Sequence, residues 1–425
     1  MVKTETLPSG LRLVTESLPH VRSAAIGVWL TRGSRHESDE ESGIAHFVEH
    51  MLFKGTHRRT ARDLAQAIDS VGGQMDAFTA KEYAGYYIKV LDEHLPIALD
   101  LLSDMLLYPA LAADDVEREQ GVVLEEIKMV EDAPDDLVHE EFVQKFWSRH
   151  ALGRPILGTA DTVSSFSSDR LRNYFQRTYV APNLVVAAAG HLEHDRFRDA
   201  VAEAFAPLSA TGRVSADAPP AVSPGVVERV KDIEQSHICL GTTAYPQGHD
   251  DRHAVFVLNT ILGGSMSSRL FQHIREDRGL AYSVFSNLST YTDAGMISIY
   301  AGCAADKVDD VVTLSLRELA DLRDRDVPEE ELRRAKDHLK GSVMLGLENT
   351  SSRMSHLARQ EMVFGRHITL DEMLAQIEGV TAVAVKRVAR DLFRDGGMVA
   401  SVVGPKRSKS LAPDQLWLGG GEASA

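Results

Sequence analysis

Two histidines and a glutamate stand close together near residue 50, in the segment His46-Phe47-Val48-Glu49-His50. In a helix these three side chains share one face, because positions i, i+3 and i+4 lie within roughly 100° of one another. Two imidazoles one turn apart can bind a single zinc ion. A carboxylate on the same face can act as general base toward the water that the metal activates. The pattern is the inverted zincin motif, H-x-x-E-H.

The motif also has an ordinary interpretation. In a chain with 17 histidines it arises by chance on the order of a few times in a hundred. It would then mark a helix with two solvent-exposed histidines and a surface glutamate. The surrounding residues favour the metal site, because the segment from Gly43 to Phe53 is otherwise strongly apolar. We therefore expect its polar stripe to face a cleft rather than bulk water.

A catalytic zinc site needs a third protein ligand and an open fourth position. The segment from Val116 to Ile127 is predicted to be helical, and it carries Glu119 and Glu126. Seven residues make two turns with only about 20° of drift, so both carboxylates share a face. Glu126 is the candidate third ligand, and Glu119 is the candidate partner of the far nitrogen of a ligating histidine. Considered alone, a glutamate-rich helix is far more often a solvated surface.

With these residues together, the chain resembles the pitrilysin family of inverted-motif zinc metallopeptidases. Within that family it is similar to the two-domain, bacterial-type members of the mitochondrial processing peptidase-like branch. The family pattern is H-x-x-E-H followed about 76 residues later by a glutamate, here His46–His50 and Glu126, and the resemblance covers essentially the whole chain. It implies one Zn²⁺ per chain, bound by His46, His50 and Glu126, with Glu49 as general base and Glu119 as supporting acid.

The resemblance also implies a strand that binds the substrate. The segment from Gly72 to Thr79 resembles the family's edge strand, where an extended peptide is held by β-augmentation. The implied substrate-binding residues are Asp76, Ala77, Phe78 and Thr79. Asp76 stands where the family usually has Asn, which adds a negative charge beside the substrate.

Two further pairs match functional positions of the family. Arg275 and Tyr282 match its Arg–Tyr pair, implied to hold the substrate backbone and to stabilise the oxyanion. Without the resemblance they would be a surface arginine and a core tyrosine. Asp136 and Glu140, spaced i, i+4, match positions that bind arginine near the cleaved bond. They imply a preference for basic residues, and a solvated acidic helix start is the equally consistent alternative.

The chain is predicted to be two homologous α+β domains, each a mainly antiparallel sheet packed with helices. A segment rich in Ser, Ala, Pro and Gly, residues 208–224, falls near the midpoint and has the composition of a linker. We therefore expect an N-terminal zinc-binding domain at residues 1–207. A C-terminal homologous domain that binds no metal follows at residues 225–425.

Matched elements in the two halves indicate an internal duplication. Each half opens with alternating strand patterns. The apolar segment Leu64–Ile68 matches Leu270–Ile274, and Gly73 then aligns with Gly279. A strongly helical segment comes later in both halves.

The second half keeps this plan without the metal ligands. Aligning the helical segments puts Ala335 opposite Glu119 and Ser342 opposite Glu126, and the H-x-x-E-H helix has no counterpart around Val255–Leu262. The C-terminal domain is therefore expected to supply a wall of the site and the Arg–Tyr pair, but no metal ligand.

Composition limits the class of partner. The chain is 44% hydrophobic and 25% charged, which is typical of a soluble globular protein. Its formal charge of −16 argues against nucleic acid, because phosphate binding needs a basic surface. Cys239 and Cys303 are predicted to be buried and unpaired. No segment resembles a membrane span or a targeting peptide, so we expect no membrane partner and a cytoplasmic location.

The leading prediction is an endopeptidase that cleaves extended peptides or precursor segments. Longer relatives join four such domains into a closed chamber, so the resemblance implies a chamber of two chains. These would form a homodimer or a heterodimer with a homologous chain, and Arg275 and Tyr282 would reach the partner's zinc site. The alternatives are a non-catalytic partner subunit, in which ligands should be lost, and a peptide-binding protein with structural zinc, which would fill four protein positions. Zinc content and the activity of a Glu49→Gln variant separate these functions.

Overall fold

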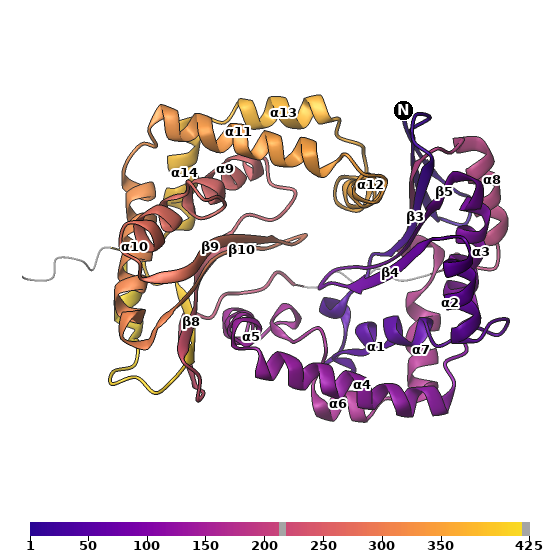
Figure 1. The fold of residues 1–425 in the computed structure, drawn as a ribbon, viewed down its shortest axis with the longest axis horizontal. Helices are drawn as coiled ribbons and strands as arrows, with labels where there is room; N and C mark the ends of the chain where they lie inside the picture. Colours follow the sequence, from indigo (N-terminus) through magenta and orange to yellow (C-terminus); the bar gives the residue numbers. More distant parts are fainter. Residues whose placement is uncertain (212–217, 419–425) are drawn as a thin grey trace, which may run out of the picture. The chain divides into compact units, whose positions relative to one another are not determined.

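The computed structural model describes residues 1–211 and 218–418 (Figure 1). The chain divides into two compact units, and each is assembled from three separate segments. The first unit comprises Met1–Lys128, Arg154–Asp217 and Leu345–Ile368. The second comprises Met129–Gly153, Ala218–Met344 and Thr369–Ala425.

The first unit contains, in its described residues, a six-stranded sheet in the order β1-β2-β6-β3-β5-β4. Its strands are β1 (Val2–Thr6), β2 (Arg12–Ser17), β6 (Leu184–Gly190), β3 (Ser23–Leu30), β5 (Ala84–Leu91) and β4 (Gln74–Thr79). Neighbouring strands are antiparallel except β2 and β6, which are parallel. The short strand β4 therefore forms one edge of the sheet.

Helices from the first half of the chain cover one face of this sheet. They are α1 (Ile44–Leu52), α2 (Ala61–Ser70), α3 (Leu95–Leu107), α4 (Ala113–Asp132), α6 (Ala160–Ser164), α7 (Ser168–Thr178) and α8 (His194–Ala204). Strand side chains such as Ile26 and Tyr86 form one buried cluster with helix side chains such as Phe47 and Leu102. This burial of apolar surface stabilises the face that carries α1.

A helix from the second half of the chain covers the opposite face. Helix α12 (Thr350–Phe364) contacts β2, β3 and β6, and Figure 1 shows it beside β3. Met354 and Leu357 pack against Trp29 and alanines such as Ala187 in a second buried cluster. Small alanine side chains let the helix approach the sheet closely, and the sheet becomes buried on both faces.

The second unit repeats this arrangement with a five-stranded sheet in its described residues, in the order β7-β11-β8-β10-β9. Its strands are β7 (Gly225–Val230), β11 (Val399–Gly404), β8 (Gln235–Ala244), β10 (Gly295–Ala304) and β9 (Ala281–Thr290). Its helices are α9 (Arg252–Leu262), a π-helical turn η6 (Phe271–Glu276), α10 (Val308–Asp324), α11 (Glu329–Gly346), α13 (Leu370–Glu378) and α14 (Ala382–Leu392). Helix α5 (Pro134–Phe146), from the first half of the chain, packs on its β8 and β11.

The two sheets confirm the predicted fold class and the duplication. Strands β2-β6-β3-β5-β4 correspond in order and direction to β7-β11-β8-β10-β9, including one parallel pair in each sheet. The prediction that the H-x-x-E-H motif has no counterpart near Val255–Leu262 is confirmed, because the helix at this place does not carry the motif. Helix α9 occupies the equivalent place in the chain and contacts β9, as α1 contacts β4. The described residues of the second half lack the ligand set.

The predicted pairing of Gly73 with Gly279 was wrong by one residue. Gly72 and Gly279 both have φ of 61° at the end of their helical segments. The amide of Gly73 donates to the carbonyl of Ile68, and the amide of Leu280 donates to the carbonyl of Ile274, each at 3.0 Å. Gly72 is thus the equivalent of Gly279. The second unit thus has one residue more between Ile274 and Gly279 than the first has between Ile68 and Gly72, and the π-helical turn overlaps this segment.

The continuous ranges expected for the domains, 1–207 and 225–425, differ from the compact units in two segments. Residues 129–153 belong to the second unit, and residues 345–368 belong to the first. Residues 212–217 of the expected linker lie outside the described residues. The remainder, 208–211 and 218–224, contains no helix or strand.

Two smaller predictions can also be compared with the structure. Cys239 and Cys303 are buried and form no disulfide in the described chain, as expected. No described helix is both long enough and apolar enough to cross a membrane. The cytoplasmic location stays a prediction.

Candidate metal centre

Helix α1 presents the three polar residues of the motif on one face. The helix begins at Ile44 and buries its apolar side chains, which are Ile44, Ala45, Phe47, Val48, Met51 and Leu52. This burial fixes the rotation of the helix. His46, Glu49 and His50 remain only partly buried, on the stripe away from the core.

Helix α4 supplies two carboxylates to the same place. It runs without interruption from Ala113 to Asp132, and Val116 and Val123 anchor it to the core. Glu119 is 3% exposed, whereas the side chain of Glu126 is 34% exposed. The two-turn spacing thus puts one glutamate deep beneath the histidines and the other beside them.

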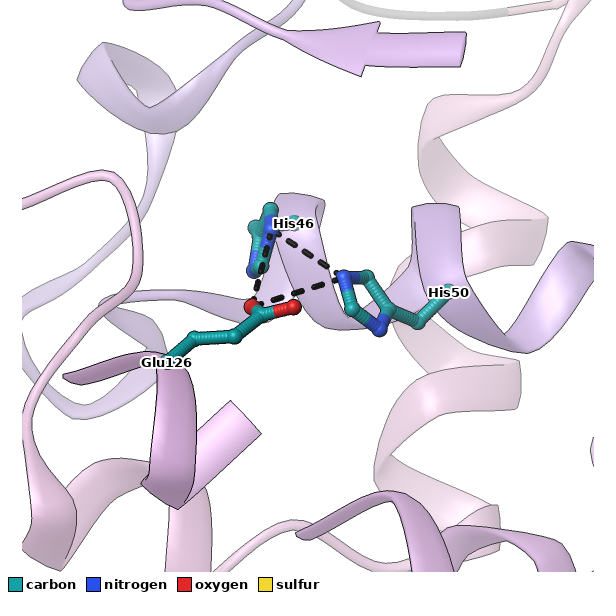
Figure 2. Close-up of side chains that lie close together, drawn as sticks. All are labelled: His46, His50 and Glu126. Atoms are coloured by element: carbon teal, nitrogen blue, oxygen red, sulfur yellow. Dashed lines mark hydrogen bonds and ion pairs between the residues drawn. The ribbon is translucent and has the colours of Figure 1, made fainter. Parts of the chain in front are cut away.

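Three donor atoms converge where the two helices meet (Figure 2). The Nε2 atoms of His46 and His50 lie 3.2 Å apart. Glu126 Oε2 lies 3.7 Å from Nε2 of His46 and 3.6 Å from Nε2 of His50. Elsewhere in the described chain, no second group of three such side chains could hold a metal ion.

These separations fit a tetrahedral zinc ion. Ligand atoms at about 2.0–2.1 Å from one ion lie roughly 3.4 Å from one another in a tetrahedron. The three observed separations of 3.2, 3.6 and 3.7 Å bracket that value, so one ion can lie at about 2.1 Å from all three atoms, slightly above their plane. Two imidazoles and one carboxylate also form a donor set that zinc prefers, and they leave a fourth position to water or substrate.

His50 is oriented from behind by Glu119. Its Nδ1 lies 2.8 Å from Glu119 Oε1, so a proton on Nδ1 leaves the lone pair of Nε2 free for the metal. The other oxygen of Glu119 lies 2.6 Å from Nζ of Lys54. Lys54, Glu119 and His50 therefore form a hydrogen-bonded chain that leads from the surface to a metal ligand.

His46 is held in its neutral form. Burial and, to a smaller extent, the neighbouring His50 lower its pKa to about 4, and Glu119 acts in the opposite direction. A neutral imidazole is the form that binds a metal. Its Nδ1 is buried and has no hydrogen-bond partner among the described residues. The orientation of this ring thus depends on packing rather than on a polar contact.

Glu49 lies beside the donors and is bound to the edge strand. The hydroxyl of Thr79 donates a hydrogen bond to Glu49 Oε2. Burial raises the pKa of Glu49, and nearby Asp76 and Glu126 add to this, while Thr79 and His50 oppose it. The strand thus holds this carboxylate next to the convergent donors, where it can accept a proton from a water molecule.

The predicted substrate-binding strand is β4, an edge strand that among the described strands pairs only with β5. Asp76 accepts hydrogen bonds from the Tyr87 hydroxyl at 3.0 Å and from the amide of Ala77 at 2.8 Å. Phe78 packs edge-on against the ring of Tyr83. The strand ends at Thr79, so its free edge ends directly beside Glu49.

Arg275 and Tyr282 lie in the second unit, and there they contact each other. The guanidinium of Arg275 stacks over the Tyr282 ring at 5.1 Å and over the Phe271 ring at 4.7 Å. Tyr282 is 80% exposed, so it is not the core residue that its type alone suggested. Arg275 lies within the π-helical turn.

Asp136 and Glu140 lie on α5, also in the second unit. Asp136, Asp135 and His139 line a cavity of about 420 Å³ together with Tyr282 and Tyr300. His139 stacks on Tyr300 with ring centroids 5.2 Å apart. The structure thus brings Asp136 and Tyr282, predicted separately, to one cavity with acidic and aromatic walls.

Two contacts of the site were not predicted from the sequence. Thr79 was expected to bind substrate, and its bond to Glu49 was missed because β-strand register is needed to see it. Lys54 was not considered. Its spacing of four residues from His50 could have indicated it, since that spacing returns to the same face of a helix.

Comparison with known families gives two matches that cover most of the chain. Residues 12–160 match the model for insulinase, peptidase family M16, and residues 165–339 match the model for the peptidase M16 inactive domain. The metal donors described above all lie within the first of these ranges. The second match carries none of them.

Several curated relatives are similar over nearly their full length. The uncharacterized zinc protease YmxG of Bacillus subtilis is 44% identical, with 95% of this chain and 98% of the relative covered. The zinc protease SCO5738 of Streptomyces coelicolor is 44% identical, with 97% and 91% covered. The zinc protease Rv2782c of Mycobacterium tuberculosis is 45% identical, with 97% and 95% covered.

Solved structures agree in fold. A peptidase M16 inactive domain from Pseudomonas fluorescens superposes with a TM-score of 0.90 at 20% identity, with 96% of this chain and 100% of that chain covered. A protease from Helicobacter pylori has a TM-score of 0.88 at 22% identity, with 95% and 100% covered. At these identities the likeness shows the fold alone.

Proposed function

Because the chain belongs to peptidase family M16, the insulinase family of zinc-dependent peptidases, we propose that it is a zinc endopeptidase acting on extended peptides. The observation that carries this proposal is the convergence of His46 Nε2, His50 Nε2 and Glu126 Oε2 within 3.7 Å of one another. These three side chains are the proposed ligands, with one zinc ion per chain.

Glu49 is the proposed general base. When bound, zinc polarises the peptide carbonyl and makes a bound water more acidic. The Glu49 carboxylate accepts a proton from the attacking water and delivers it to the leaving amine. The hydrogen bond from Thr79 keeps the carboxylate in place, and Glu119 keeps the His50 ring oriented.

The substrate is proposed to bind along β4. The free edge of this strand offers backbone donors and acceptors that can pair with an extended peptide. Thr79 ends the strand next to Glu49, so a peptide paired with this edge would run toward the proposed base. Asp76 adds a negative charge along this path.

Arg275 and Tyr282 are proposed to bind the substrate backbone and the oxyanion. Their stacked arrangement and the exposure of Tyr282 support this role, because both side chains are available to a ligand. They belong to the unit in whose described residues no group of metal donors is found. We therefore propose that two chains, identical or homologous, together form the complete site and its chamber.

A preference for basic residues near the cleaved bond is part of the proposal. The cavity lined by Asp135, Asp136 and Tyr300 combines carboxylates with aromatic faces, and both attract a guanidinium or an ammonium group. Glu140 stands one helical turn from Asp136. In a peptide library, the Asp136→Asn variant should lose enrichment for Arg and Lys that the wild type has. If the wild type shows no enrichment for Arg or Lys near the cleaved bond, this part of the proposal is wrong.

The central experiment measures zinc content and peptide cleavage together. Glu49→Gln should keep one zinc per chain and lose at least about 100-fold in kcat, since general-base catalysis contributes roughly 10²–10⁴-fold. Glu126→Gln should lose zinc. Glu125→Gln is the matched control, because that side chain is 69% exposed and pairs only with Lys128 among the ion pairs of α4. A zinc-loaded Glu49→Gln variant that cleaves like the wild type would disprove the assignment of the base.

A further inference from the structure

The N-terminus of the motif helix has no cap of its own. The residue before α1 is Gly43, with φ of 93°, and it offers no side chain to the first amides of the helix. Ser42 does not replace it, because its buried hydroxyl has no hydrogen-bond partner in the described part of the chain. The first four amides of a helix have no partner within the helix, so they need acceptors from elsewhere.

The side chain of Glu37 supplies these acceptors. The amide of Gly43 donates to Glu37 Oε2 at 2.9 Å, and the amide of Ala45 donates to Oε1 at 2.8 Å. Glu37 is only 6% exposed. Both oxygens of a buried carboxyl group are thus used at the start of one helix.

Glu37 is itself held in place from the far side. Arg154 Nη2 donates to its backbone carbonyl at 2.5 Å. Gly43 lies close to Gly158: a Cβ atom added to Gly43 would be 2.8 Å from the Gly158 Cα. The hydroxyl of Thr162 donates to the carbonyl of Ser42 at 2.8 Å. The start of α1 is therefore fixed on both sides by contacts that reach no ligand directly.

From these contacts we propose that Glu37 is a positioning residue for the metal centre, an inference that rests on the proposed zinc site. Ala45, whose amide it binds, directly precedes His46. His46 needs such external positioning, because its Nδ1 has no polar contact of its own in the described residues. By fixing the start of α1, Glu37 sets where the His46 ring meets Glu126 and His50. A local role as a helix cap alone would affect stability and leave zinc affinity unchanged.

The experiment compares the zinc affinity of two variants, each of which loses the cap of one helix in the first unit. Glu37→Gln keeps the shape of the side chain, but its amide group offers one acceptor where two amides must be bound. Thr60→Ala is the control, because Thr60 caps α2 in the same unit and accepts from the Asp63 amide at 3.2 Å. Zinc affinity of the metal-free proteins is measured by competition with a chromophoric chelator. Hydrogen exchange of residues 43–53 is followed alongside.

Glu37→Gln should bind zinc about tenfold more weakly, the lower end for residues that orient ligands indirectly, and should exchange faster across α1. Thr60→Ala should bind zinc within about twofold of the wild type. Unchanged affinity in Glu37→Gln, or equal losses in both variants, would overturn the inference. Should Glu37→Gln fail to fold, Glu37→Asp is judged by the same criteria. A wild-type chain that binds no zinc would instead refute the proposed function.

Discussion

The donors of the metal centre differ in how they are held. His50 is fixed by Glu119, and Glu119 is fixed in turn by Lys54. His46 has only its packing and the anchored start of its helix. At the scale of single residues, Lys54 is the least expected member of the site, because it contacts no ligand and its side chain is 36% exposed.

Replacing Lys54 by Met should weaken zinc binding by about tenfold. Methionine keeps the length of the side chain but removes the donor that fixes the second oxygen of Glu119. Lys54→Arg should restore most of the affinity, since arginine can donate to the same oxygen. Competition with a chromophoric chelator measures the effect. The control is Lys128→Met, which removes an exposed lysine paired with Glu125. Equal affinities of Lys54→Met and wild type would rule out this role.

At the scale of elements, α1 depends on a carboxyl group that is costly to bury. Burial raises the pKa of Glu37 to about 8 from an ordinary value of 4.5. The hydrogen bonds from Ala45 and Gly43 and the charges of Arg154 and Lys81 oppose this rise. Tyr174 of α7 also faces the group. The folded chain therefore holds this proton to higher pH than the unfolded chain does.

This difference gives a testable pH dependence. Below about pH 4.5 the carboxyl group is protonated in both states, and its contribution to stability is complete. As the pH rises toward 8, only the unfolded chain releases the proton. The stability of the wild type relative to Glu37→Gln should then fall, by up to about 1.4 kcal/mol per pH unit. Urea unfolding of both proteins between pH 5 and 9 measures this. A difference that does not vary with pH would contradict the assigned pKa.

At the scale of the whole molecule, each half of the chain contributes a helix that covers one face of the sheet formed by the other half. Helix α12 covers the sheet of the metal-binding unit, and α5 covers the sheet of the second unit. The two units are therefore coupled by the chain itself. Stability of the metal-binding unit depends on residues more than 300 positions from the motif.

The Leu357→Ala variant tests whether α12 stabilises the sheet of the first unit. Leu357 is 2% exposed and packs with Trp29 on the sheet of the first unit. Its truncation should cost about 2–5 kcal/mol and should speed hydrogen exchange in β3 and β6. Leu345→Ala, at a residue that is 68% exposed, should change neither. Faster exchange confined to β8 and β11 would contradict the assignment of α12 to the first unit.

Mixing inactive variants tests whether two chains share one site. In a Glu49→Gln chain the base is missing, and in an Arg275→Ala chain the substrate contact is missing. If Arg275 serves the partner's metal centre, mixed dimers regain one complete site, and random exchange should restore about a quarter of the wild-type activity. Light scattering verifies the dimer. If the mixture stays inactive although subunit exchange is proven, Arg275 does not serve the partner's metal centre.

The metal donors could be predicted from the sequence because helix geometry is local. The spacing of His46, Glu49 and His50 fixes their common face, and the spacing of Glu119 and Glu126 does the same on α4. The repeated order of strands and helices likewise indicated two α+β units. Each of these inferences needs only the regular rise and rotation of an element, which neighbouring residues determine.

Only the tertiary structure decided which segments belong together. An amphipathic helix carries no information about which of two similar sheets it will cover, so the exchange of α5 and α12 could not be predicted. The contacts of Glu37 with α1, of Thr79 with Glu49 and of Lys54 with Glu119 likewise depend on loop paths and strand register. The sequence therefore determined which residues can bind the metal. The tertiary structure determined how they are held, because side chains distant in sequence are fixed only when the elements pack.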